Sequence, residues 1–222
     1  TVVFHHGSTG RGDDPSRFGR TWTAPRAAAI LLAHGWMTVF PQRRGRGRSD
    51  GRYEEGLGRD GYSCDPATAL AGLDRALEDA DAIREALCTR PDIDPKRLVV
   101  AGHSRGGLLA VAHAGARPDA FAGAVNVVGG WMTDRCPKID AIHQVAFRRA
   151  GDYRGPTLWL YGEDDPFYRM RHSRGNFRTF QDAGGRGDFH ALRLPPGASG
   201  HDVLAHPDLW SPRLLAFLDH LR

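Results

Sequence analysis

Short apolar runs alternate along the chain with longer segments in which apolar residues recur every three or four positions. The short runs predict strands, and the periodic segments predict helices. Several runs are apolar throughout, which suits strands that helices cover on both faces of a parallel sheet. The predicted strands are Val2–Phe4, Thr38–Pro41, Leu98–Ala101, Ala122–Val128, Thr157–Tyr161 and His190–Leu194.

Prolines and capping residues mark where several helices begin. Asp65 followed by Pro66 opens the longest helix, whose apolar face runs to Leu87. Ser211 with Pro212 is expected to open the last helix. The other predicted helices cover residues 25–34, 105–116, 139–149 and 171–183.

No internal repeat and no linker divides the chain, which favours one domain over residues 1–222. Residues 130–155 separate two predicted strands and form a small excursion that resembles a minimal cap. We therefore expect an open site at the carboxyl ends of the strands.

Residues 98–107 read LVVAGHSRGG, in which a predicted strand passes through GxSxG into a predicted helix. In this setting the motif predicts a nucleophile elbow, a strained turn that presents the hydroxyl of Ser104. Gly102 and Gly106 are needed because the chain approaches both positions too closely for a side chain. The helix N-terminus also favours negative charge beside the serine. His103 is interpreted as structural.

The acid and the base are expected after later strands, in the order serine, acid, histidine. Asp165 lies in the turn GEDDPF and is the predicted acid, with Asp164 as the alternative and Glu163 as a poorer one. His201, in the small-residue loop GASGHD, is the predicted base. Its rivals are His190, His206 and His220.

The first strand leads into HHGSTG, residues 5–10, which predicts a loop that donates to an oxyanion. One backbone N–H is expected from Arg105, directly after the nucleophile. The other is expected from Ser8, with Gly7 as the alternative, while His6 braces the loop. These groups together predict acyl transfer through an acyl-enzyme.

Taken together, these motifs resemble the α/β-hydrolase superfamily, nearest to the serine-nucleophile branch that is similar to dienelactone hydrolase and related to prolyl-oligopeptidase catalytic domains. The resemblance implies an α/β-hydrolase fold with a mostly parallel central sheet of about six strands, flanked by helices. It also implies Ser104, Asp165 and His201 as the triad, and it favours Asp165 over Asp164. The motifs that carry it are HHGSTG (5–10), FPQRRGRGRSDG (40–51), AGHSRGG (101–107), LYGEDDPFY (160–168) and SGHD (199–202).

Two features depart from that branch. Dienelactone hydrolase itself uses a cysteine nucleophile where this chain has Ser104, which argues against dienelactone as the substrate. The fold usually has more strands than the six predicted here, and the chain begins at what would be the third. The chain also begins without Met or a leader, so either a leader has been removed or a longer protein precedes it.

Three aromatic residues follow strand ends on the predicted catalytic side. Trp131, Phe167 and Tyr168 are expected to form an apolar wall for the acyl or leaving group, and core packing is an equal alternative. Arg43, Arg44 and Arg105 could attract an anionic substrate, although the first two are better explained as solvated loop residues.

Charge and cysteine content change this picture little. The chain has 30 basic against 26 acidic residues, a net charge of +4. Its most basic run, QRRGRGRSDGR at 42–52, holds no aromatic residue for base stacking, so a solvated loop is favoured over a nucleic-acid site. Cys64 and Cys136 lie in loops and could pair if the protein is exported, whereas Cys88 is expected to be a buried apolar residue.

No apolar run is long enough to span a membrane, and the cysteine spacing predicts no zinc site. We expect a soluble serine esterase, cytoplasmic or exported, that acts on small or medium carboxylic esters without metal or cofactor. A peptidase or amidase is the nearest alternative, and an acyltransferase would share the same residues. A non-catalytic binding module is the alternative of another class.

Overall fold

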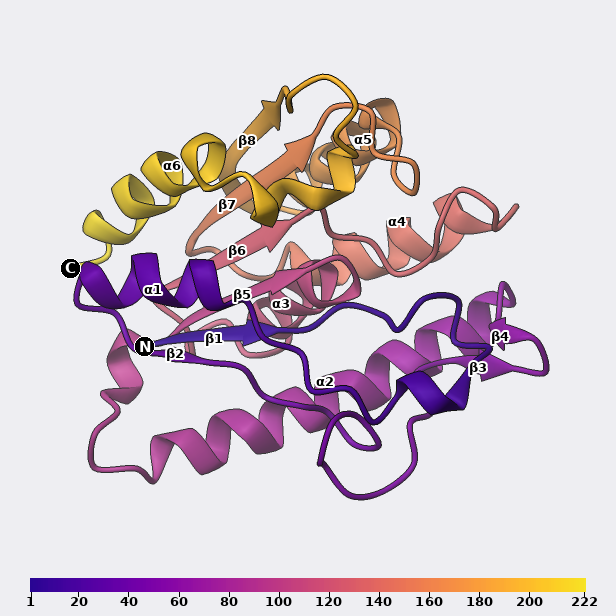
Figure 1. The fold of residues 1–222 in the computed structure, drawn as a ribbon, viewed down its shortest axis with the longest axis horizontal. Coiled ribbons are helices and arrows are strands. Elements are labelled where there is room, and N and C mark those ends of the chain that lie inside the picture. The colour runs from indigo at the N-terminus through magenta and orange to yellow at the C-terminus, as the bar shows by residue number, and fades with distance from the viewer.

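In the computed structural model, which describes residues 1–222, six parallel strands form a sheet between two layers of helices (Figure 1). The strand order is β2-β1-β5-β6-β7-β8, and every neighbouring pair is parallel. The strands are β1 (Val2–His5), β2 (Thr38–Val39), β5 (Val99–His103), β6 (Gly123–Val127), β7 (Pro156–Gly162) and β8 (Arg186–Leu192). This confirms the predicted α/β class and the number of strands.

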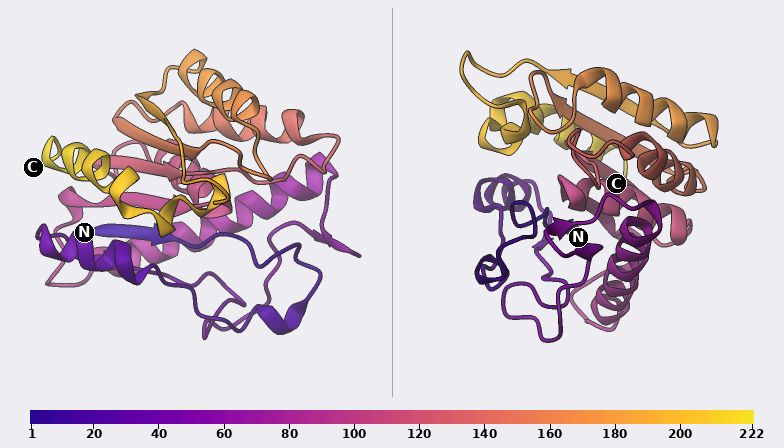
Figure 2. Two further views of the ribbon diagram at one scale, coloured as in Figure 1. Left: turned by 45° about the horizontal axis from the view of Figure 1, so that its top comes forward. Right: turned by 90° about the vertical axis from the view of Figure 1, so that its right-hand side faces the viewer.

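The helices cover both faces of the sheet, which explains why the inner strands are buried throughout (Figure 2). On one face lie α1 (Pro25–Ala33) and α6 (Pro207–Asp219), which contact each other. On the other face four helices pack in sequence, α2 (Pro66–Cys88), α3 (Arg105–Ala116), α4 (Ile139–Ala150) and α5 (Met170–Asp182). None of these helices is both long enough and apolar enough to cross a membrane.

The strand order reverses between β1 and β5. From β1 the chain moves outward to β2 and then returns to build the sheet on the other side of β1. Ligands of open α/β sheets bind at the carboxyl ends of the strands at such a switch point. The loop after β1 and the turn after β5 therefore meet where a site is expected.

The predicted start of α2 is confirmed by its capping. The Asp65 carboxylate accepts a hydrogen bond from the backbone N–H of Thr68 at 2.9 Å, and Pro66 occupies the first turn. The predicted start of the last helix is wrong, because α6 begins at Pro207 and carries Ser211 and Pro212 inside it. Pro207 supplies the same N-terminal signal five residues earlier.

The edges of the sheet depart most from the prediction. β8 begins at Arg186, four residues before the predicted start at His190, because it is an edge strand with polar residues. β2 is limited to Thr38–Val39. A small antiparallel hairpin, β3 (Leu57–Gly58) and β4 (Gly61–Tyr62), was not predicted at all, since two-residue strands leave no alternating pattern.

The excursion over residues 130–155 contains α4, which packs in the helical layer between α3 and α5. Its first part, Trp131–Cys136, is the part that lines the pocket described below. No helix of this segment therefore lies over the carboxyl ends of the strands.

Candidate active site

Ser104 lies in the turn between β5 and α3 with φ 57° and ψ −125°, a conformation that a residue with a side chain rarely adopts. A Cβ at Gly102 would lie 2.0 Å from the carbonyl oxygen of Gly106. A Cβ at Gly106 would lie 2.2 Å from the carbonyl oxygen of His5 on β1. Both glycines are therefore required sterically, which confirms the interpretation of the motif as a strained elbow.

The predicted acid and base are directly hydrogen-bonded. His201 Nδ1 lies 2.9 Å from Asp165 Oδ2. The other oxygen, Asp165 Oδ1, accepts the backbone N–H groups of Phe167 (2.8 Å) and Tyr168 (3.2 Å). The carboxylate is thus buried and fixed in orientation, whereas Asp164 is exposed.

Two glycines let the acid and base segments pack backbone against backbone. A Cβ at Gly200 would lie 2.0 Å from the carbonyl oxygen of Glu163, and one at Gly162 would lie 2.1 Å from that of Gly200. His201 itself lies in a short 3-10 helix, Gly200–Ala205. The predicted loop is thus helical at His201, where Ser199 caps the turn by accepting the N–H of His201 at 3.2 Å.

His103 is half-buried, and its Nε2 lies 3.0 Å from the backbone carbonyl oxygen of His201. Burial, and then the nearby His201, lower the pKa of His103 to about 4. The neutral ring can donate its Nε2–H to that carbonyl and hold the base in place, so His103 has the predicted structural role.

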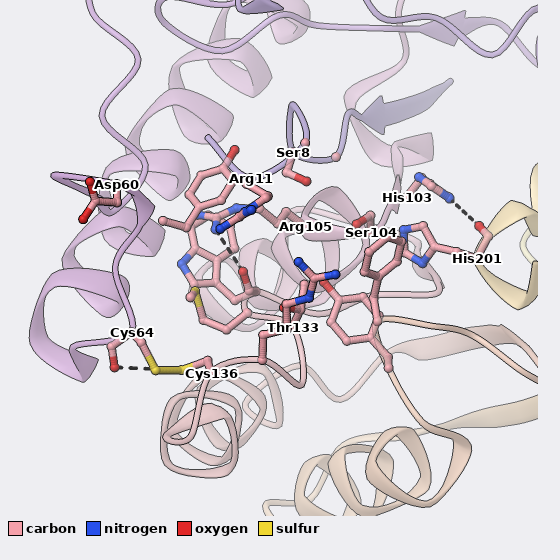
Figure 3. A pocket seen from close by; sticks show the side chains of 18 of the residues that line it. Ser8, Arg11, Asp60, Cys64, His103, Ser104, Arg105, Thr133, Cys136 and His201 are labelled. Atoms are coloured by element: carbon pink, nitrogen blue, oxygen red, sulfur yellow. Dashed lines mark hydrogen bonds between the residues drawn. A yellow bond between two sulfur atoms is a disulfide. The ribbon is translucent and has the colours of Figure 1, made fainter. Parts of the chain in front are cut away.

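Ser104 and His201 open onto one pocket of about 630 Å³ (Figure 3). The pocket is also lined by every residue predicted for the oxyanion hole and the substrate wall, namely Ser8, Arg105, Trp131, Phe167 and Tyr168. In Figure 3 the labelled Ser104 and His201 lie together at one end, with Arg105 and Thr133 between them and the other end.

The loop after β1 is held by donors to its carbonyl oxygens. The carbonyl of His6 accepts two bonds of 3.2 Å from Arg43. The carbonyl of Gly7 faces His6 Nδ1 at 2.8 Å and Arg46 Nη1 at 3.4 Å. Because C=O and N–H point in opposite directions across a trans peptide, the N–H groups of Gly7 and Ser8 point away from these arginines.

His6 braces this loop as expected. Its Nε2 accepts the backbone N–H of Arg43 at 3.3 Å, which leaves Nδ1 to donate to Gly7. Burial, followed by the charges of Arg43 and Arg46, lowers the pKa of His6 well below its ordinary value. The ring is therefore neutral, as this bonding requires.

The sequence profile of the prolyl oligopeptidase family matches residues 67–184, just over half of the chain. The chain belongs to the prolyl oligopeptidase family. It is thus a serine hydrolase of the α/β-hydrolase type, and the matched segment contains both Ser104 and Asp165. No curated protein sequence shows significant similarity to the chain.

Solved structures similar to this family member include several esterases. Esterase Pf2001 of Pyrococcus furiosus is 17% identical, with a TM-score of 0.69 over 99% of this chain and 80% of that one. Est1E of Butyrivibrio proteoclasticus, solved with ferulic acid bound, is 16% identical, with a TM-score of 0.69 over 99% and 88%. Esterase PE8 is 19% identical, with a TM-score of 0.63 over 100% and 92%. At these identities the similarity establishes the fold alone.

In this hydrolase the side chain of Arg105 forms part of the pocket floor. Its Cζ lies 3.5 Å from the ring centroid of Trp131 and 3.9 Å from that of Tyr62. Its terminal nitrogens donate to the carbonyl oxygens of Trp131 (2.9 Å) and Glu55 (2.6 Å). The guanidinium therefore joins the two pocket walls. Because carbonyl oxygens and aromatic rings already surround its positive charge, no anionic substrate is needed to account for Arg105.

The three predicted wall aromatics differ in their surroundings. Trp131 is buried and donates from Nε1 to the carbonyl of Ala69 at 2.7 Å. Tyr168 is buried and donates to the carbonyl of Gly130 at 2.9 Å. Phe167 is 39% exposed and packs edge-on against the ring of His201 at 4.7 Å. Trp131 and Tyr168 thus belong to both the wall and the core, whereas Phe167 lies at the rim.

The arginine-rich loop is not simply solvated. Arg43 and Arg46 are 1% and 2% exposed, and Arg43 forms an ion pair with the buried Glu55. Arg44 is partly exposed and pairs with Asp79 and Glu78 on α2. The expectation of surface solvation is therefore wrong for Arg43, because a buried partner at another point of the chain cannot be inferred from the local pattern.

A hydrogen-bonded series of side chains behind Trp131 was also not predicted from the sequence. His143 Nε2 accepts the backbone N–H groups of Trp131 (2.8 Å) and Met132 (3.1 Å). Its Nδ1 lies 2.8 Å from His172 Nε2, and His172 Nδ1 lies 2.9 Å from Asp140. Burial lowers the pKa of His143 well below its ordinary value, so the ring stays a neutral acceptor for the pocket wall.

Cys64 and Cys136 form a disulfide, with their Cα atoms 5.5 Å apart. The sequence had left this pairing open. Both half-cystines line the pocket, whereas the third cysteine, Cys88, is free and half-buried on α2.

Proposed function

We propose that this protein hydrolyses carboxylic esters through an acyl-enzyme formed on Ser104. The observation that carries the proposal is the 2.9 Å bond between His201 and the buried Asp165, on the same pocket as a serine held in an elbow. With Nδ1 donating to Asp165, the other ring nitrogen is free to accept the proton of Ser104. The serine then attacks the ester carbonyl, the alcohol leaves with a proton from His201, and water completes the cycle.

The charge that develops on the carbonyl oxygen requires fixed donors. We assign these to the backbone N–H groups of Arg105, in the first turn of α3, and of Ser8. The assignment is supported by the carbonyl of Gly7, which faces His6 and Arg46 and so turns the N–H of Ser8 the opposite way. Gly7 remains the alternative, since a Cβ built there would lie 3.0 Å from that of Ser104.

A peptidase or amidase is the second candidate, and membership of the prolyl oligopeptidase family favours it. We prefer esters because Asp60 is the sole carboxylate among the residues that line the pocket. Asp60 is exposed and lines the pocket at the end opposite His201 (Figure 3). A substrate amino terminus would thus find its only counter-charge far from Ser104.

Two measurements test this function. The purified protein is assayed with p-nitrophenyl esters from acetate to decanoate and with prolyl p-nitroanilides. It is also treated with an alkylphosphonate, and the modified residue is identified by mass spectrometry. Ester turnover with labelling of Ser104 is expected. Amide turnover with little ester turnover would favour the peptidase, and an unlabelled Ser104 in a folded sample would favour a binding module.

Asp165→Asn is expected to lower kcat on p-nitrophenyl acetate by about 10⁴-fold, because an amide neither selects the needed tautomer of His201 nor stabilises its charged form. Asp164→Asn is the matched control. This residue is exposed and has φ 59°, a conformation that asparagine tolerates, so its kcat should stay near the wild-type value. If the effects of the two substitutions were exchanged, Asp164 would be the acid.

A further inference from the structure

The pocket ends at a covalent bond. Both half-cystines of the Cys64–Cys136 disulfide line it, and in Figure 3 they lie at the end opposite His103 and His201. Cys64 follows the β3–β4 hairpin, and Cys136 precedes α4. The bond thus joins the same two walls that Arg105 joins near Ser104, through the carbonyls of Glu55 and Trp131.

The space between Ser104 and the disulfide has aromatic rings against which an apolar chain can pack, next to the polar Arg11 and Thr133 (Figure 3). Tyr62 and Trp131 each stack a ring on Arg105, and all three residues line the pocket. The two terminal nitrogens of Arg105 donate to carbonyl oxygens, and its side chain is almost fully buried between the two rings, so the rings rather than the guanidinium would meet the substrate. An acyl group on Ser104 that follows these rings runs toward the disulfide.

We propose that the Cys64–Cys136 disulfide is the end wall of the acyl subsite and sets the longest acyl chain that the enzyme accepts. The inference rests on the proposed ester hydrolysis. Cys136 is buried and the two Cα atoms are fixed 5.5 Å apart, so this wall cannot yield as two unlinked loops could. An acyl chain that reaches the sulfur atoms gains nothing from a further methylene, because that methylene has no pocket left to enter.

The test compares chain-length profiles, with each kcat/KM divided by that for acetate. Cys64→Ala/Cys136→Ala opens the end of the pocket, and its profile should extend to longer esters. Each methylene newly buried should raise the ratio by about fourfold. Cys64→Val/Cys136→Val refills the space with methyl groups and should keep the wild-type cutoff. Cys88→Ala removes the cysteine outside the pocket and should leave the profile unchanged.

A second measurement does not depend on the folding of these variants. A crystal structure of the wild-type enzyme with an alkylphosphonate on Ser104, at the longest accepted chain, should place the terminal carbon against the disulfide. The proposal is overturned if that chain leaves past Phe167, or if the wild-type profile rises without a break to decanoate. It is equally overturned if the alanine pair keeps the wild-type cutoff, or if the valine pair loses it.

These outcomes are separable from failure of the proposed function. Suppose that acetate is hydrolysed and Ser104 is labelled, but the chain-length cutoff does not change when the disulfide is removed. The proposed esterase activity is then supported, and the proposal that the disulfide is the end wall is overturned. If no ester is hydrolysed by the wild type, the proposed function fails first.

Discussion

Ser104→Ala is expected to lower kcat for the preferred p-nitrophenyl ester by about 10⁶-fold, the loss seen when a serine hydrolase of this mechanism loses its nucleophile. The alanine leaves no oxygen to form the acyl-enzyme, and water must then attack the ester directly. The pocket is otherwise unchanged, so a residual rate of about 10³ to 10⁴ over the uncatalysed reaction should persist from binding and the oxyanion donors. The measurement is kcat and KM, together with titration of active sites by an alkylphosphonate.

Ser211→Ala supplies the matched control for this loss. The chemical change is identical, but Ser211 lies on α6, away from the residues that line the pocket. Its kcat should equal that of the wild type. Activity retained by folded Ser104→Ala, with KM and inhibitor titration unaltered, would contradict the acyl-enzyme mechanism and require another nucleophile in the pocket.

The elbow was predictable because its requirements are local. A strand, a turn that needs Gly102 and Gly106, and a helix follow one another within ten residues, and the steric reasons hold in the structure. Asp165 and His201 could be predicted from the order of the elements, because the first follows β7 and the second follows β8. The bond between them could be expected from the order of the elements, although the 3-10 helix around His201 could not.

Residues that depend on distant partners were beyond such inference. The sequence predicted Arg43 to be a solvated loop residue, yet it is buried because the buried Glu55 neutralises its charge. Tyr62 lies on a strand too short to leave a pattern, although its ring packs on Arg105 in the pocket floor. Burial of a charge is decided by its partner in space, and local hydropathy carries no information about that partner.

The same reasoning explains why pocket shape was harder to predict than pocket chemistry. The proposed reacting groups follow strand ends, which a parallel sheet collects at one edge. The walls are joined by two tertiary links, the side chain of Arg105 and the Cys64–Cys136 disulfide. The two half-cystines are 72 residues apart in the sequence. The proposed specificity therefore depends on the part of the structure that the sequence reveals least.

Glu55→Gln is expected to lower the free energy of unfolding by about 3 kcal/mol or more, because it leaves a buried guanidinium without its counter-charge. The carboxylate of Glu55 pairs with Arg43, accepts the hydroxyl of Tyr53 at 2.9 Å and lies 3.9 Å from Arg105 Nε. Urea unfolding at pH 7 measures the loss. Glu54→Gln is the control, since Glu54 is exposed and its ion pairs of 3.4 and 3.6 Å should contribute less than about 1 kcal/mol.

The loss should depend on pH in one direction. Burial by itself raises the pKa of Glu55, but the charges of Arg43 and Arg105 and the hydrogen bonds from Arg43 and Tyr53 lower it below the ordinary value of 4.5. A carboxyl whose pKa is lower in the folded state stabilises the fold above its unfolded pKa, and this contribution disappears as the pH falls through the folded pKa. The difference between wild type and Glu55→Gln should therefore be full at neutral pH and shrink only below about pH 4.5. A difference that is already absent at pH 7, or that stays constant far into acid, would show that the buried carboxylate does not hold the two arginines as the structure implies.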